Sequence, residues 1–223
     1  MTDNSEKKRL EKMLEFERAA WERGFSFVAG VDEAGRGPLA GPLVVAAVLF
    51  QKNSPIPPVD DSKKIPENRR AELRKAILDT PGVETALVEI SPGRIDELNI
   101  LRATHEGMRR ALEQLKNADF ALVDGLNVPN LHIPAEFIVK GDAKSASVAA
   151  ASIIAKTRRD EIMVELDGKY PGYGFAAHKG YGTKLHLEAL KRLGPTPIHR
   201  RSFKPVRDSL EPPPEQMELN LFD

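Results

Sequence analysis

The chain has 223 residues, 41% hydrophobic and 30% charged, and its 33 Lys and Arg residues balance its 33 Asp and Glu residues. This composition is typical of a globular protein, and the length suits one domain with at most a small appendage. Cysteine is absent, which excludes disulfides and thiolate metal sites and fits a reducing cytoplasm. No apolar run is long enough to span a bilayer, and the charged N-terminus does not resemble a secretory signal. We therefore expect a cytoplasmic protein without a membrane contact.

Charge is distributed unevenly along the chain. Residues 140–207 hold 14 Lys and Arg against 6 Asp and Glu, a net charge of +8, whereas residues 208–223 hold 5 acidic residues and no basic one. A basic segment of this kind is typical of proteins that bind a polyanion such as nucleic acid. A solvated helix face would give the same charge, so the partner has to be argued from motifs.

Hydrophobic periodicity and chain breakers predict the elements. In chain order they are a helix over residues 5–23, strands over 25–31 and 42–50, a helix over 66–78 and a strand over 83–90. There follow a short helix after Ser91-Pro92, a helix over 101–116, strands over 119–124 and 137–140, and helices over 145–166 and 183–193. This order predicts an α/β fold with a mixed five-stranded sheet flanked by helices. We expect an N-terminal helix (1–24), a main domain that includes C-terminal helices (25–207) and a flexible acidic tail (208–223).

One stretch organises the rest of the chain. An apolar strand leads into two adjacent carboxylates, Asp32 and Glu33, and a Gly-Arg-Gly turn follows at residues 35–37. Successive side chains of a strand point to opposite faces, so both acids can reach one ion only where the strand ends. Gly35 and Gly37 permit the turn and a close approach of backbone to a ligand, and Arg36 suits an anionic substrate. An ordinary strand-to-turn boundary with solvated charges is the alternative.

Two further acids follow predicted strands. Asp124 ends one strand and Asp142 lies just past another, so three segments can deliver carboxylates to one sheet edge. Four such oxygen donors suit Mg²⁺ or Mn²⁺, and two ions would support phosphodiester hydrolysis. Taken alone, Asp142 could instead cap the helix that begins near Ser145.

The motifs together resemble the bacterial ribonuclease HII family. The matching stretches, in that family's order, are VAGVDEAGRGPLAGPLVVAAV, DDSKK, LVDG, VKGDAKSASVAAASIIAKTRRD, YGFAAHKGYGT and HRRSF. The resemblance implies a ribonuclease H-like fold and a metal-dependent endonuclease. Its expected substrates are RNA–DNA hybrids and single ribonucleotides in duplex DNA, cut on the 5′ side to leave 3′-hydroxyl and 5′-phosphate ends. The Gly-Arg-Gly element favours this family over ribonuclease HIII, which typically has Gly-Lys-Gly.

The resemblance also implies roles for individual residues. The metal-binding and catalytic carboxylates would be Asp32, Glu33, Asp124 and Asp142. Gly35, Arg36 and Gly37 would read the ribose 2′-hydroxyl, the group that distinguishes RNA from DNA. Tyr181 would pack against the deoxyribose on the 3′ side of the junction, although a core or loop tyrosine is the alternative. The expected phosphate contacts are Lys63, Lys64 and Lys156. We expect the histidines at positions 178, 186 and 199 to be surface or phosphate-proximal residues.

The acidic tail carries a separate motif. Residues 218–222, Glu-Leu-Asn-Leu-Phe, resemble the short peptides with which bacterial replication proteins bind the sliding clamp. A tail whose apolar residues fold back on the domain is the alternative. No feature of the sequence demands more than a monomer.

Two other functions stay open at this point. One is a structure-specific DNA endonuclease of similar fold, against which the Gly-Arg-Gly element argues. The other is a non-catalytic module that binds RNA–DNA hybrids. Four carboxylates without metals would repel nucleic acid, which argues against that module.

Overall fold

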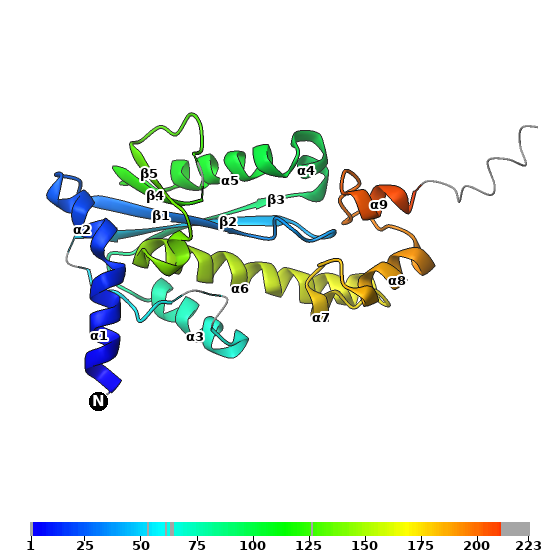
Figure 1. Cartoon of the computed structure of the whole chain (residues 1–223), viewed down its shortest axis with the longest axis horizontal. Coiled ribbons are helices and arrows are strands. Elements are labelled where there is room, and N and C mark those ends of the chain that lie inside the picture. Colours follow the sequence, from blue (N-terminus) through cyan, green and yellow to red (C-terminus); the bar gives the residue numbers. More distant parts are fainter. Residues whose placement is uncertain (1, 53, 61, 63–64, 126, 211–223) are drawn as a thin grey trace, which may run out of the picture.

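The computed structural model describes residues 2–52, 54–60, 62, 65–125 and 127–210. Its centre is a five-stranded sheet in the order β3-β2-β1-β4-β5, seen edge-on in Figure 1. The strands are β1 (Phe27–Ala34), β2 (Leu43–Gln51), β3 (Glu84–Ile90), β4 (Phe120–Asp124) and β5 (Ala135–Ile138). β2 is antiparallel to both of its neighbours, whereas β1, β4 and β5 run parallel, so the sheet is mixed as the sequence predicts.

Helices cover both faces of this sheet. In Figure 1, α4 and α5 lie along one face, and α6 runs along the other with α3 beside it. The helices with their bounds are α1 (Thr2–Met13), α2 (Glu15–Glu22), α3 (Glu67–Leu78), α4 (Pro92–Leu98), α5 (Ile100–Gln114), the 3₁₀ turn η1 (Gly141–Ala143), α6 (Ala146–Lys169), α7 (Phe175–His178), α8 (Lys184–Leu193) and α9 (Lys204–Asp208). None of the described helices is both long enough and apolar enough to cross a membrane.

β2 explains how the two faces are filled. Its apolar residues are all buried and alternate between two clusters. Those on one side pack with α6 and α3: Val44, Ala46, Val48 and Phe50. Those on the other side pack with α5: Leu43, Val45, Ala47 and Leu49. The central strand is therefore fixed from both faces.

α6 lies unusually close to β1. A Cβ added at Gly30 of β1 would stand 2.1 Å from the backbone carbon of Ser147 in the first turn of α6. No side chain fits in that space, so strand and helix meet backbone to backbone. The contact places the rest of α6 over the end of β1.

The parallel strands bring their carboxyl ends to one edge. β4 pairs with β1 from Val28↔Phe120 to Val31↔Val123, so Asp32 and Asp124 are the next residues of two adjacent strands. β1 continues to Ala34 and pairs there with β2. Residues 32–34 therefore extend past the last pair with β4 in the described chain. The edge of β1 that faces β4 has no partner among the described strands at these residues.

Several predicted boundaries were wrong. The single N-terminal helix is two helices, α1 and α2, which meet at Leu14. β1 does not end before the acids but runs three residues past Val31, because the ladder with β2 continues. α6 extends to Lys169, and the short helices α7 and α9 were not predicted as such. Residues 211–223, most of the predicted tail, lie outside the described residues.

Candidate active site

A pocket of about 230 Å³ opens where β1 extends past β4. It is lined by residues from β1 and its turn, β4, the loop before α3, α6 and the loop before α8: Asp32, Glu33, Ala34, Gly35, Arg36, Gly37, Ser62, Asp124, Ser152, Lys156, Arg159 and Tyr181. Most of the residues that the sequence singles out thus meet at one place.

Asp32 is the most buried carboxylate of the pocket. Its side chain is only 4% exposed, and it accepts hydrogen bonds from the Ser152 hydroxyl and, over 2.7 Å, from the Glu33 N–H. Burial raises the pKa of Asp32 well above its usual value, and the negative charges of Glu33 and Asp124 raise it further. The hydrogen bonds oppose this shift without cancelling it. The site therefore concentrates negative charge that a cation would relieve.

The donor set fits a hard divalent cation. Asp32, Glu33 and Asp124 are carboxylates that open on one pocket, and Asp124 is oriented by the Gly141 N–H, which donates to its Oδ1 over 2.6 Å. In the described part of the chain, however, no three acidic or histidine side chains already form an enclosing metal cage. Mg²⁺ usually keeps several waters and takes one or two carboxylates together with substrate phosphates. An open arrangement of this kind is compatible with that mode of binding.

Asp142 lies next to this group but not in the pocket lining that the structure describes. It sits in η1, it is 4% exposed, and it follows Gly141, whose N–H holds Asp124. The alternative that Asp142 caps α6 is wrong, because the N-cap is Ser145, whose hydroxyl oxygen accepts the Val148 N–H. Capping of α6 therefore does not account for the buried position of Asp142.

The Gly-Arg-Gly turn depends on its two glycines in different ways. Gly35 has a φ of +101°, and a Cβ there would lie 2.1 Å from Nε of Arg159, so only glycine fits. Gly37 has no such φ, and a Cβ there would meet only the Tyr181 ring, at 3.6 Å. Between them, Arg36 pairs with Glu33 over 3.5 Å. The turn thus faces Tyr181 across the pocket.

Two buried arginines, which the sequence analysis missed, support this turn from within. Arg200 is fully buried and donates to the carbonyls of Gly35 (2.6 Å), Arg36 (3.0 Å) and Gly41 (3.0 and 3.1 Å). Arg159 donates in the same way to the carbonyls of Pro42, Lys179 and Ala40. Burial lowers the pKa of Arg159 to about 10 and that of Arg200 to about 9.

The bonds from Arg200 also fix which way the turn presents its N–H groups. All peptides of the described chain are trans, so each N–H points opposite to the carbonyl of the same peptide. The carbonyls of Gly35 and Arg36 point to Arg200. The N–H groups of Arg36 and Gly37 therefore point away from the buried guanidinium and are free of competition from it.

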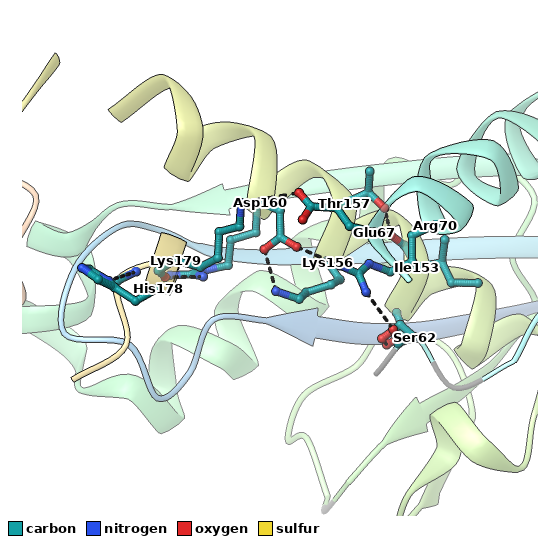
Figure 2. Close-up of polar contacts among 12 residues, drawn as sticks. Ser62, Glu67, Arg70, Ile153, Lys156, Thr157, Asp160, His178 and Lys179 are labelled. Atoms are coloured by element: carbon teal, nitrogen blue, oxygen red, sulfur yellow. Dashed lines mark hydrogen bonds and ion pairs between the residues drawn. The ribbon is translucent and has the colours of Figure 1, made fainter. Parts of the chain in front are cut away.

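A polar network connects the pocket to α3, and Figure 2 shows its part around Asp160. Lys156 and Arg70 share Asp160, at 2.5 Å and 3.2 Å, and Arg70 also donates to the Ser62 carbonyl over 3.2 Å. The Ser62 hydroxyl lies 2.9 Å from that of Ser152. Because the Ser152 hydroxyl donates to Asp32, its oxygen receives the Ser62 hydroxyl proton. Lys156 thus lines the pocket, but Asp160 holds its ammonium group, and its contact with a phosphate stays a prediction.

Tyr181 is 47% exposed and lines the pocket, whereas the prediction of a surface or phosphate-proximal position is wrong for two of the three nearby histidines. His186 and His199 are buried, and His178 and His186 stack with ring centroids 4.5 Å apart. All three histidine rings pack against Phe175, and His178 is half-buried. The predicted phosphate contacts Lys63 and Lys64 lie outside the described residues.

Of the two buried arginines that the sequence analysis missed, only Arg159 could have been found from the sequence pattern. Ser152, Lys156, Arg159 and Met163 follow one another at helical spacing, so a charged residue shares a stripe with Met163, which is buried. Arg200 lies in the loop before α9, where no periodicity indicates burial.

Known proteins resemble this chain over most of its length. The family described as Ribonuclease HII matches residues 29–206. The Ribonuclease HII of Chlamydia pneumoniae is 50% identical over 207 residues, which are 92% of this chain and 96% of that protein. The crystal structure of ribonuclease H2 from Pyrococcus horikoshii OT3 matches with a TM-score of 0.67 and 28% identity, over 82% of this chain and 96% of that chain. The PCNA:RNase HII complex from Archaeoglobus fulgidus contains a chain that matches with a TM-score of 0.63 and 29% identity, over 85% of this chain and 99% of that chain.

The family match includes every described residue that lines the pocket, and the curated relative is covered almost completely. A non-catalytic module is thereby excluded. The chain belongs to the ribonuclease HII family and is a ribonuclease H, a hydrolytic endonuclease.

Proposed function

We propose that the enzyme hydrolyses the RNA strand of RNA–DNA hybrids and also nicks duplex DNA on the 5′ side of a single embedded ribonucleotide. The products would carry 3′-hydroxyl and 5′-phosphate ends. The observation that carries this proposal is the single pocket that combines three carboxylates, the Gly-Arg-Gly turn and Tyr181. Carboxylates alone would serve any metal-dependent nuclease, whereas the turn and the aromatic ring can read the sugar.

Asp32, Glu33, Asp124 and Asp142 are the proposed ligands of two divalent cations, Mg²⁺ or Mn²⁺. When bound, such ions activate the attacking water and stabilise the leaving oxygen of a phosphodiester. The part played by the chain is to hold the carboxylates close together despite their repulsion, which the raised pKa of Asp32 reflects through burial and through Glu33 and Asp124. No histidine is required as general base, and the rings of the three histidines near Tyr181 pack against one another or against Phe175.

The sugar would be recognised by the turn. The N–H groups of Arg36 and Gly37 point away from Arg200, so they can donate to the ribose 2′-hydroxyl oxygen. Tyr181 would pack on the deoxyribose that follows on the 3′ side, and Gly37 leaves room for that contact. Lys63, Lys64 and Lys156 are proposed to contact phosphates. Lys156 is paired with Asp160, so its ammonium group would have to share that carboxylate with a phosphate.

The test uses a labelled DNA duplex with one ribonucleotide, the same duplex without it, and a long RNA–DNA hybrid. Each is incubated with Mg²⁺, Mn²⁺ or EDTA. We expect metal-dependent nicking on the 5′ side of the ribonucleotide, cleavage of the hybrid and no cleavage of the all-DNA duplex. Cleavage of both duplexes would overturn the assignment of the turn and favour a DNA endonuclease.

A second experiment separates cleavage from binding. Asp124→Asn keeps the oxygen that accepts the Gly141 N–H but removes the charge. Cleavage should collapse while binding of the hybrid, measured by fluorescence anisotropy in EDTA, survives. Full activity of this variant would contradict the metal assignment.

A clamp partner is also proposed. Residues 218–222 resemble a clamp-binding peptide, and the related RNase HII of Archaeoglobus fulgidus forms a complex with PCNA. The motif lies outside the described residues, and a short peptide with a few apolar anchors would bind weakly because it loses conformational freedom. Titration of a labelled 211–223 peptide with a bacterial clamp tests this, with Leu221 and Phe222 replaced by Ala as control. The absence of binding at several hundred micromolar clamp would remove the idea.

We further propose that the enzyme acts as a monomer in the cytoplasm. The sequence holds no motif that demands a second copy, and the curated relatives are bacterial proteins, whose DNA lies in that compartment. Light scattering in the presence and absence of duplex tests the oligomeric state. A dimer at working concentration would contradict it.

A further inference from the structure

An acidic residue lies buried in the N-terminal helical region. Glu17 of α2 is 0% exposed, and its Oε1 accepts hydrogen bonds from the Ser145 hydroxyl (2.6 Å), the Ser147 N–H (2.8 Å) and the Ser147 hydroxyl (2.7 Å). Its Oε2 has no hydrogen-bond partner in the described part of the chain. Burying a carboxylate costs free energy, and here burial raises the pKa of Glu17 although the serine bonds oppose the shift. A neutral side chain at this position would avoid that cost.

The bonds of Glu17 all go to the start of α6. Ser145 is the N-cap of that helix, and its oxygen also accepts the Val148 N–H over 3.2 Å. The amide of Ser147 belongs to the first turn, whose N–H groups have no partner within the helix. A carboxylate at this end is favoured by the helix dipole. Glu17 therefore fixes the position at which α6 begins.

The same serine connects Glu17 to the proposed metal ligands. The Ser145 N–H donates to the Gly141 carbonyl over 2.8 Å, and the Gly141 N–H donates to Oδ1 of Asp124 over 2.6 Å. Asp142 lies in η1 between these two residues. A continuous series of hydrogen bonds thus runs from α2 through the loop that carries Asp142 to the carboxylate of Asp124.

We propose that Glu17 is a positioning residue for the nuclease reaction: it holds residues 141–145, and through them Asp124 and Asp142, in the arrangement that the metals require. The inference rests on the proposed roles of those two acids. It assigns a task to α2, which precedes the residues matched by the family. Glu17 touches neither substrate nor metal in this account.

The test compares three variants with the wild-type enzyme at a temperature well below unfolding. Glu17→Ala should lower kcat by about tenfold or more, because misplaced ligands cost rate, and should leave KM unchanged because the turn and Tyr181 are intact. Glu17→Gln should recover most of kcat, since its amide oxygen can accept the same hydrogen bonds. Ala20→Gly is the matched control: Ala20 is a buried residue of the same helix that packs in an apolar cluster. It should lower the Tm without lowering kcat.

A second readout does not depend on turnover. Mn²⁺ should raise the Tm of the wild type, because a ligand that binds the folded state stabilises it. The rise should be smaller for Glu17→Ala and normal for Ala20→Gly. Should Glu17→Ala not fold, Ser147→Ala removes one donor to Glu17 without altering α2, and a smaller decrease of kcat and of the Mn²⁺ effect is expected.

Two outcomes would overturn the inference. One is a normal kcat and Mn²⁺ effect in Glu17→Ala. The other is an equal loss of kcat in Glu17→Ala and Ala20→Gly, which would indicate general destabilisation. Asp142→Asn distinguishes failure of the inference from failure of the proposed function. If that variant and the wild type cleave equally, the role of Asp142 itself is wrong.

Discussion

The Nε2 atoms of His186 and His199 lie 3.1 Å apart in the interior. The neighbouring hydrogen bonds determine which of these two nitrogens carries the proton that lies between them. The Thr196 N–H donates to Nδ1 of His199, so the proton of His199 is on Nε2 and is donated to His186. The Nδ1–H of His186 then donates to the Tyr181 carbonyl over 2.9 Å. This relay holds the loop of Tyr181 only while both rings are neutral.

The relay predicts sensitivity to acid. Burial, and to a smaller extent the neighbouring His186, lowers the pKa of His199 to about 4. Burial likewise lowers the pKa of His186. Unfolded histidines bind protons near pH 6.5, so the unfolded state takes up protons that the folded state excludes. The free energy of unfolding should therefore fall as the pH decreases from about 6.5 toward 4.

Urea unfolding at a series of pH values measures this slope. His199→Gln should flatten it, because the glutamine does not titrate. His132→Gln, at an exposed histidine, is the control and should leave it unchanged. An equal slope in the wild type and in His199→Gln would contradict the prediction.

Arg200→Lys tests the support of the turn. A lysine keeps the charge, but one ammonium cannot reach the carbonyls of Gly35, Arg36 and Gly41 as the guanidinium does. We expect a loss of about 2–4 kcal/mol in the free energy of unfolding and a weaker preference for the ribonucleotide duplex. Chemical denaturation and the paired cleavage assay measure the two effects. Arg201→Lys, at the exposed neighbour, should show neither.

The two glycines of the turn should respond differently to alanine. Gly35→Ala forces a left-handed backbone on a residue with a Cβ and collides with Arg159, so we expect a loss of about 1–3 kcal/mol in stability. Gly37→Ala meets only the Tyr181 ring at 3.6 Å and should fold normally. Its effect should appear as a higher KM for the ribonucleotide duplex. Equal Tm losses in both variants would show that the distinction is wrong.

Asp124→Asn should abolish activity but increase the stability of the metal-free enzyme. In the metal-free enzyme the charge of Asp124 raises the pKa of buried Asp32, so neutralising it removes a repulsion. We expect the variant to be inactive yet about 1 kcal/mol more stable than the wild type in EDTA. Addition of Mn²⁺ should reverse the order, because only the wild type gains from binding. Thermal unfolding with and without Mn²⁺ decides this, and a less stable variant in EDTA would contradict it.

The sheet and the meeting of Asp32, Glu33 and Asp124 could be predicted because their signals are local. Apolar runs mark the strands, and parallel strands carry the acids that follow them to a common edge. The end of β1 could not be predicted, because it depends on how far the antiparallel ladder with β2 continues, which is to the pair of Ala34 and Val44. Sequence alone also cannot divide α1 from α2 at Leu14, since residues 5–23 continue one helical pattern.

The roles of buried polar residues were hidden for a related reason. Arg200 and His199 are charged or titratable types that usually lie at the surface, and only the packed carbonyls and rings around them make burial tolerable. Glu17 is equally inconspicuous among the charges of α2. The partners of Arg200 and Glu17 lie far away in sequence, where periodicity carries no information.

Because Gly30 has no side chain, nothing separates the backbone of β1 from the backbone of α6. β1 carries Asp32 and Glu33 on one side of the pocket, and α6 carries Ser152 and Arg159 on the other. Because strand and helix touch through their backbones at Gly30 and Ser147, the width of the active site is set inside the core, remote from any substrate. A single methyl group at residue 30 would push α6 away from β1 and so widen the pocket between Asp32 and Ser152.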